Sequence, residues 1–187
     1  LVRSTENTRG LSTFNGGDIN EMFNDLSYRL NEAKIKQSYL GLISGNHDTT
    51  RISNYLSLEK LKSFYIMMFT LPGIPFILYG DEIMMKTSFI ESKDGGYQRT
   101  GTRIPMIWDN SFQHGFTKSD NLYLPFNDEL NPSSLEDNKN DKNSIFNFLK
   151  ELIKIRKRED SLKTFDYELS LDNQVLKIRR GNLITIV

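Results

Sequence analysis

Residues 40–51 read Leu40-Gly41-Leu42-Ile43-Ser44-Gly45-Asn46-His47-Asp48-Thr49-Thr50-Arg51, an apolar run followed by an amide, an imidazole, a carboxylate and a guanidinium. A short apolar run bounded by turn residues is typical of a buried strand. We therefore predict a strand over residues 38–43, with the polar residues 46–51 at its C-terminal end. Because α/β folds place ligand-binding groups at the carboxyl ends of parallel strands, this stretch is the candidate functional site.

The neighbouring segments alternate between helix and strand patterns. Apolar residues recur at helical spacing over residues 19–34 and 57–70, and a second continuous apolar run covers residues 74–79. Both predicted strands are apolar throughout, which is typical of parallel strands that are buried on both faces. A further amphipathic helix begins after Ser144 and ends in a basic turn, as the helix dipole favours. These patterns predict an α/β fold.

The pattern changes near residue 162. Short β-patterned segments at 165–169, 175–178 and 183–187 are separated by turn residues, which indicates antiparallel hairpins. Such hairpins after parallel α/β units predict a first domain over residues 1–161 and a second over 162–187. The sequence begins without methionine and stops inside the last predicted strand, so we expect it to be a piece of a longer polypeptide.

Composition excludes several classes of function. Lys+Arg and Asp+Glu are both 24, so the formal net charge is zero and nothing favours nucleic acid or an anionic membrane as partner. The absence of cysteine excludes disulfides, thiolate zinc sites and a cysteine nucleophile. No apolar run approaches the ~18–20 residues that a membrane-spanning helix needs.

Three separated stretches resemble conserved regions of glycoside hydrolase family 13, the α-amylase and α-glucosidase superfamily. In the family's order they are Asn46-His47-Asp48-x-x-Arg51, Gly73-Ile74-Pro75-x-x-x-Tyr79-Gly80-Asp81-Glu82 and Arg99-x-Gly101-x-Arg103-x-Pro105-Met106-x-Trp108-Asp109. The helix after Ser144 is similar to the eighth barrel helix, and the hairpins are similar to the start of the family's small β domain. The resemblance covers roughly residues 17–187.

This resemblance implies a fold and a reaction. Residues 1–161 would form the C-terminal part of a (β/α)8 TIM barrel, about strands seven and eight, and residues 162–187 the beginning of an antiparallel β-sandwich domain. The reaction would be retaining cleavage or transfer at an α-glucosidic bond of an α-linked gluco-oligosaccharide or α-glucan. The resemblance implies no cofactor, and because no Asp-rich loop is visible here, any calcium would be held outside this sequence.

The resemblance also implies roles for single residues. Asp48 matches the family's third catalytic carboxylate, which grips hydroxyls of the reacting sugar and stabilises its oxocarbenium-like transition state. Substrate binding falls to four residues: Asn46, His47, Arg51 and Arg103. Arg51 is expected to orient a carboxylate in the pocket, and on residue chemistry alone it could hold Asp48 ionised. Asp81 and Glu82 match residues that hold the loop after strand eight.

Two of the three catalytic carboxylates have no counterpart in the sequence. The family's nucleophile motif, Gly-x-Arg-x-Asp, is absent from the 187 residues, and no predicted strand ends in an acid/base glutamate. We therefore predict that this chain is inactive by itself. A trehalose-synthase-like isomerase remains an alternative because it shares the same carboxylates. Thr49-Thr50 stand where the α-glucosidase branch often has Gln-Pro, which leaves the subgroup open.

Other interpretations remain. A lone His-Asp pair also fits a loop with a helix cap. Gly45-Asn46-His47-Asp48 after a strand resembles the metal-bridging motif of calcineurin-like metallophosphoesterases. Those enzymes need further histidine motifs, whereas only His47 and His114 exist here. A non-catalytic amylase-like interaction domain is the third class, although a degraded pocket has no reason to keep all four polar residues of the first motif.

Overall fold

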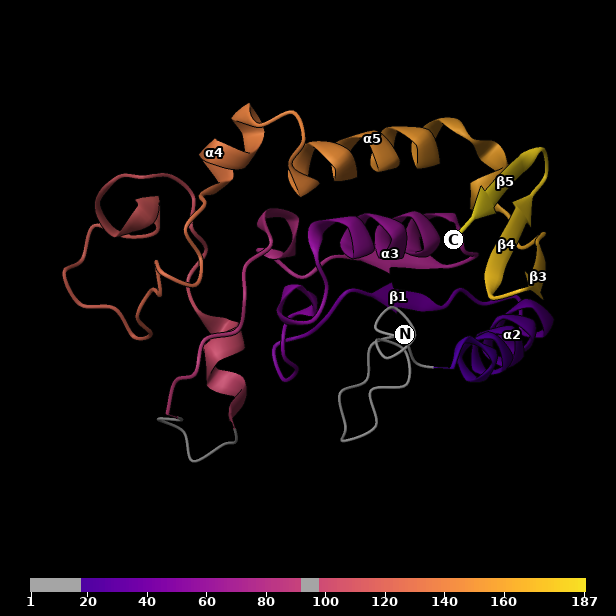
Figure 1. Ribbon diagram of the computed structural model, residues 1–187, viewed down its shortest axis with the longest axis horizontal. Helices are drawn as coiled ribbons and strands as arrows, with labels where there is room; N and C mark the ends of the chain where they lie inside the picture. Colours follow the sequence, from indigo (N-terminus) through magenta and orange to yellow (C-terminus); the bar gives the residue numbers. More distant parts are fainter. Residues whose placement is uncertain (1–17, 92–97) are drawn as a thin grey trace.

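The computed structural model describes residues 18–91 and 98–187 (Figure 1). The first 17 residues of the predicted first domain lie outside this part, and so does the side chain of Arg99 from the third motif.

Three long helices form where the apolar spacing predicts them. They are α2 (Ile19–Ile35), α3 (Leu58–Thr70) and α5 (Ile145–Arg158). Each begins after a residue whose side chain accepts a backbone N–H of the first turn, namely Asp18, Ser57 and Ser144. These caps satisfy donors that a helix start leaves free. The predicted helices are confirmed, with ends that differ by about one residue.

Two parallel strands lie side by side, β1 (Gly41–Ile43) and β2 (Ile74–Phe76), with Leu42 opposite Pro75. They are shorter than predicted, and the expectation that both faces are buried is wrong. Leu42 is 2% exposed, whereas Ile74 is 48% and Phe76 is 54% exposed. The reason is that in the described part of the chain the helices cover one face of this sheet.

The core lies between the sheet and the helices α3 and α5. Figure 1 shows α5 lying along α3, and α3 lying along the strands. Leu42 packs in one cluster with Leu61, Phe64 and Met68 of α3 and with Leu149 of α5. The sheet and both helices therefore share a single apolar core.

The C-terminal segment forms a three-stranded antiparallel sheet in the order β3-β4-β5. Its strands are β3 (Glu168–Asp172), β4 (Val175–Arg180) and β5 (Leu183–Ile186), so the predicted hairpins are confirmed. Leu176 and Ile178 of β4 belong to the same apolar cluster as α3. The core is continuous across residue 162, and the domain division there stays a prediction.

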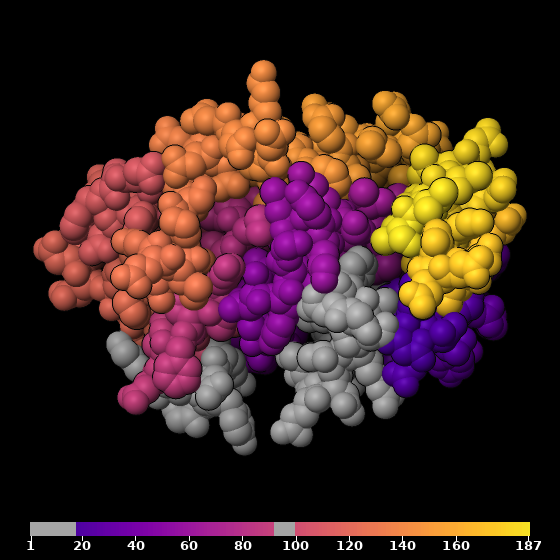
Figure 2. Space-filling model, viewed as in Figure 1, coloured from indigo at the N-terminus to yellow at the C-terminus, as the bar shows by residue number. Residues whose placement is uncertain are grey.

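The long segment after β2 carries small elements of its own. They are the 3-10 helices η2 (Asp81–Ile83), η3 (Gln98–Arg103) and η4 (Phe112–Gly115), and the helix α4 (Leu135–Asn140). Two other 3-10 helices, η1 (Ile52–Asn54) and η5 (Asp160–Lys163), follow β1 and α5. A second apolar cluster, which includes Met85, Ile104 and Ile107, supports the segment. Figure 2 shows that this long segment lies at the opposite end of the molecule from the C-terminal sheet.

No helix within residues 18–91 and 98–187 is long and apolar enough to cross a lipid bilayer.

Candidate active site

The carboxyl ends of β1 and β2 meet at one edge of the parallel sheet. The Phe76 carbonyl accepts the backbone N–H of Ser44 at 3.0 Å, which continues the pairing one residue beyond β1. The Ser44 hydroxyl donates to Oδ2 of Asp81 at 2.6 Å and accepts the N–H of Leu78 at 3.0 Å. The two polar stretches that follow the strands are therefore in direct contact.

A tight turn presents His47 and Asp48 to solvent. The side-chain Oδ1 of Asn46 accepts the backbone N–H of Asp48 at 2.8 Å, a local bond that mimics a backbone turn. The His47 and Asp48 side chains are 68% and 44% exposed, and Nε2 of His47 lies 3.3 Å from Oδ2 of Asp48. When an exposed imidazole and carboxylate lie side by side, both can hydrogen-bond the hydroxyls of one small ligand. The carboxylate accepts hydrogen bonds, and the imidazole can donate or accept them.

Arg103 completes this exposed group from a distant part of the sequence. Its Nη2 lies 2.8 Å from Oδ1 of Asp48, and its Nε donates to the backbone carbonyl of His47 at 3.1 Å. The η3 segment thus delivers a cation to the loop after β1. Of the residues predicted for the site, the structure brings His47, Asp48 and Arg103 together at the surface.

Arg51 is placed differently from the other predicted residues. Its side chain is fully buried, and Nη1 lies 3.0 Å from Oδ1 of Asp81 and 2.6 Å from the carbonyl of Tyr79. Its Nη2 donates to the carbonyl of Thr102 at 3.0 Å. This placement corrects the expectation that Arg51 contacts the sugar or holds Asp48 ionised. A buried guanidinium needs a buried counter-charge, and Asp81 supplies it.

Burial shifts the titration of the acidic groups beneath the loop. It raises the pKa of Asp81 to about 6, although the hydrogen bond from Ser44 and the charge of Arg51 favour the ionised form. Burial also raises the pKa of Glu82, and it raises the pKa of Tyr65 well above its usual range. At neutral pH Asp81 is ionised and pairs with Arg51.

Asp81 is expected to make the unfolding free energy fall as pH rises from about 4 to about 6. Its folded-state pKa of about 6 lies above its ordinary value of 3.8. The folded state therefore binds the proton more tightly, and this stabilisation is full at low pH and lost through pH 6. The change amounts to a few kcal/mol at most, since one pKa unit is worth about 1.4 kcal/mol.

Urea denaturation at several pH values, on wild type and Asp81→Asn, measures this slope. Asp81→Asn removes the titrating group and should therefore flatten the dependence of the unfolding free energy on pH. Asp160→Asn is the control, because it changes an exposed carboxylate whose side chain is 92% exposed. The same pH dependence in wild type and Asp81→Asn would contradict the assignment.

Sequence reasoning missed two threonines at this site, the partly buried Thr87 and the buried Thr102. The hydroxyls of Thr87 and Thr102 are 2.9 Å apart and bond to the backbone of residues 49–51. Threonine is common in both loops and strands, so neither position stood out in the sequence. The available signal was that Thr102 immediately precedes Arg103 in the third motif.

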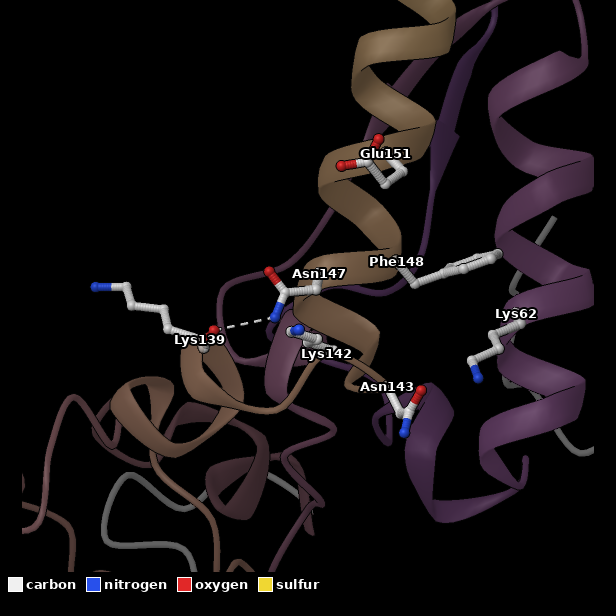
Figure 3. Close-up of a pocket in the computed structure, with 7 residues that line it drawn as sticks. All are labelled: Lys62, Lys139, Lys142, Asn143, Asn147, Phe148 and Glu151. Atoms are coloured by element: carbon white, nitrogen blue, oxygen red, sulfur yellow. Dashed lines mark hydrogen bonds between the residues drawn. The ribbon is translucent and has the colours of Figure 1, made fainter.

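The cavity between α3 and α5 lies elsewhere and is not the candidate site. It has a volume of about 500 Å³, and its lining comprises Lys62, Lys139, Lys142, Asn143, Asn147, Phe148 and Glu151. Figure 3 shows the Lys139 side chain extending away from Phe148 and Lys62, so the positive charges do not converge on one point. Within residues 18–91 and 98–187, no three His, Asp or Glu side chains are grouped so as to hold a metal ion.

Comparison with known proteins identifies the family. Residues 2–164 match the family model described as the alpha amylase catalytic domain. The chain is 33% identical over 129 residues to an alpha-glucosidase of Apis mellifera, covering 62% of this chain and 23% of that protein. It is 26% identical over 144 residues to an amino acid transporter heavy chain of Mus musculus, covering 76% of this chain and 20% of that protein.

A solved structure shares the arrangement of the elements. Trehalose-6-phosphate hydrolase of Bacillus licheniformis superposes with a TM-score of 0.73 at 24% identity, covering 89% of this chain and 36% of that one. The chain thus spans between a fifth and about a third of the length of these three proteins. The fold, the motifs and the family match agree, and the chain belongs to glycoside hydrolase family 13, the α-amylase superfamily.

Proposed function

We propose that this chain is the C-terminal part of the (β/α)8 catalytic barrel of a longer α-glucosidase or α-amylase, followed by the start of a β-sandwich domain. The observation that carries the proposal is the exposed group of His47, Asp48 and Arg103 at the carboxyl ends of two parallel strands. TIM-barrel enzymes place their active sites at this end of the strands. The family match supports the reaction class, an α-glucosidic bond.

In the proposed mechanism Asp48 binds hydroxyls of the reacting sugar and is neither the nucleophile nor the proton donor. Its carboxylate favours the distorted, positively charged ring of the transition state over the ground state. The His47 imidazole hydrogen-bonds the same ring, and Arg103 holds the carboxylate at 2.8 Å and offers its own donors. The nucleophile and the acid/base carboxylate of this retaining reaction lie outside these 187 residues.

Covalent trapping in the full-length protein tests this division of roles. The full-length protein should hydrolyse an aryl α-glucoside and release the α-anomer first. A fluorinated glucosyl fluoride that slows the second step should leave a sugar attached to one carboxylate. Peptide mapping is expected to find this label outside residues 1–187, and the isolated 187-residue chain should have no turnover. A label on Asp48 would contradict the assignment.

A non-catalytic role is the second candidate. The relative named as an amino acid transporter heavy chain favours it, since its printed name describes no hydrolase. The partly exposed pair of Asp48 and Arg103 favours the enzyme, because an ion pair that water can reach contributes little to stability. Failure of the full-length protein to cleave or rearrange any α-glucoside would favour the interaction domain. Rearrangement in place of hydrolysis would favour a trehalose-synthase-like isomerase.

A further inference from the structure

The backbone that follows Asp48 is held by two threonine hydroxyls from other segments. The N–H of Arg51 donates to Oγ1 of Thr87 at 2.8 Å, and Oγ1 of Thr102 donates to the carbonyl of Thr49 at 2.9 Å. The two hydroxyl oxygens are 2.9 Å apart. Since Thr102 already uses its hydrogen, the hydrogen between them belongs to Thr87. The bonds therefore run in one direction, from the Arg51 amide to the Thr49 carbonyl.

Thr102 connects this chain of bonds to the exposed group. It is 1% exposed, and its carbonyl accepts Nη2 of the buried Arg51 at 3.0 Å. The next residue, Arg103, pairs with the Asp48 carboxylate and bonds the His47 carbonyl. Residues 102 and 103 thus hold the Asp48 loop at three points: the carbonyls of Thr49 and His47 and the carboxylate of Asp48.

We propose that Thr102 is a positioning residue that sets the place of Asp48 relative to the reacting sugar. The proposal rests on the proposed function, because it assigns Thr102 to the same site. A β-branched side chain has few χ1 rotamers, so a buried threonine holds its hydroxyl in a fixed direction. Misplacing a catalytic group by about 1 Å can cost roughly a hundredfold in rate. Removing the hydroxyl leaves the Thr49 carbonyl without this donor, and the loop that carries Asp48 then loses its hydrogen bond to Thr102 while Arg103 still bonds His47 and Asp48.

The test compares three variants in the full-length protein, with an aryl α-glucoside as substrate. Thr102→Val keeps the shape and removes the hydroxyl, and we expect kcat to fall roughly 10- to 100-fold while KM changes less than about threefold. Thr102→Ser keeps the hydroxyl and should stay within about threefold of wild type in kcat. Thr70→Val is the control. It removes another buried hydroxyl, which donates to the Ile66 carbonyl at 2.8 Å within α3, and should leave kcat unchanged.

Hydrogen exchange gives a second readout that does not depend on activity. The Arg51 amide should exchange at least about tenfold faster in Thr102→Val than in Thr70→Val. The reason is that Thr87, which accepts this amide, loses the hydrogen bond that its own hydroxyl makes to Thr102. Unchanged kcat in Thr102→Val, with wild type active, overturns the positioning role alone. An inactive wild type overturns the proposed function, and the exchange rate then still decides whether Thr102 holds the loop. Loss of kcat in Thr102→Val together with faster exchange of the Arg51 amide supports both the proposed function and the positioning role of Thr102.

Discussion

Replacing Asp48 with asparagine should lower kcat of the full-length protein on an aryl α-glucoside by at least about 10²–10³-fold, the usual cost of removing a preorganised charge from a transition state. Asparagine keeps the size of the side chain but cannot carry the negative charge that favours the positively charged ring. The same substitution should change the unfolding free energy little. Asp48 is 44% exposed and pairs with an Arg103 side chain that is 32% exposed, and ion pairs open to solvent contribute less than about 1 kcal/mol.

Steady-state kinetics and thermal unfolding of Asp48→Asn, beside Asp160→Asn, separate the two effects. The control makes the same chemical change at a carboxylate that pairs with Lys163 far from the loop, and it should retain wild-type kcat. Asp48→Asn turnover within about tenfold of wild type would be too small a loss for the proposed electrostatic role. A large drop in unfolding temperature would show that Asp48 acts on the fold.

Replacing Arg180 with methionine should reduce the unfolding free energy by at least about 3 kcal/mol, since each buried acceptor left without a donor costs about 1–3 kcal/mol. Arg180 on β4 is fully buried and donates to four backbone carbonyls, those of Thr70, Ser161, Thr164 and Asp166. The bond to Thr70 attaches the C-terminal sheet to the end of α3, and the other three attach β4 to the segment 161–166 that precedes the sheet. Burial lowers the pKa of Arg180 to about 10, so the side chain stays charged at neutral pH.

The adjacent residue in the same strand is a matched control. Arg179 faces outward, and its Nε lies 3.3 Å from Oε2 of Glu168 in an exposed pair. Arg179→Met should change the unfolding free energy by less than about 1 kcal/mol. Urea denaturation followed by circular dichroism compares the two variants. Equal destabilisation by both changes would mean that the buried bonds of Arg180 do not hold the sheet to α3.

Local patterns in the sequence were sufficient to predict the helices. The capping residues Asp18, Ser57 and Ser144 stand directly before an apolar stripe, and the structure begins each helix there. Capping and helical spacing act over one or two turns, so they can be read without knowing the rest of the fold. The antiparallel hairpins were predictable for the same reason, because turn residues separate short β-patterned segments.

The strands were predicted less well, because an apolar run does not say how many of its residues pair. Apart from Ser38, residues 38–43 and 74–79 are without polar side chains of the charged, amide or small hydroxyl kind, but pairing covers only Gly41–Ile43 and Ile74–Phe76. Which face is buried depends on where the helices pack. Leu42 meets α3, whereas Phe76 is half exposed, although both side chains are apolar.

The sequence by itself determined which polar groups crowd the end of β1 and the family to which they point, because that information is carried by residue type and spacing. Only the tertiary structure decided which arginine meets which carboxylate. Arg51 is three residues from Asp48 in sequence, yet it pairs with Asp81, while Arg103 comes from η3 to reach Asp48. Strand register brings Asp81 beneath the loop, and a guanidinium in a buried position pairs with the buried carboxylate, because an uncompensated charge there would be too costly.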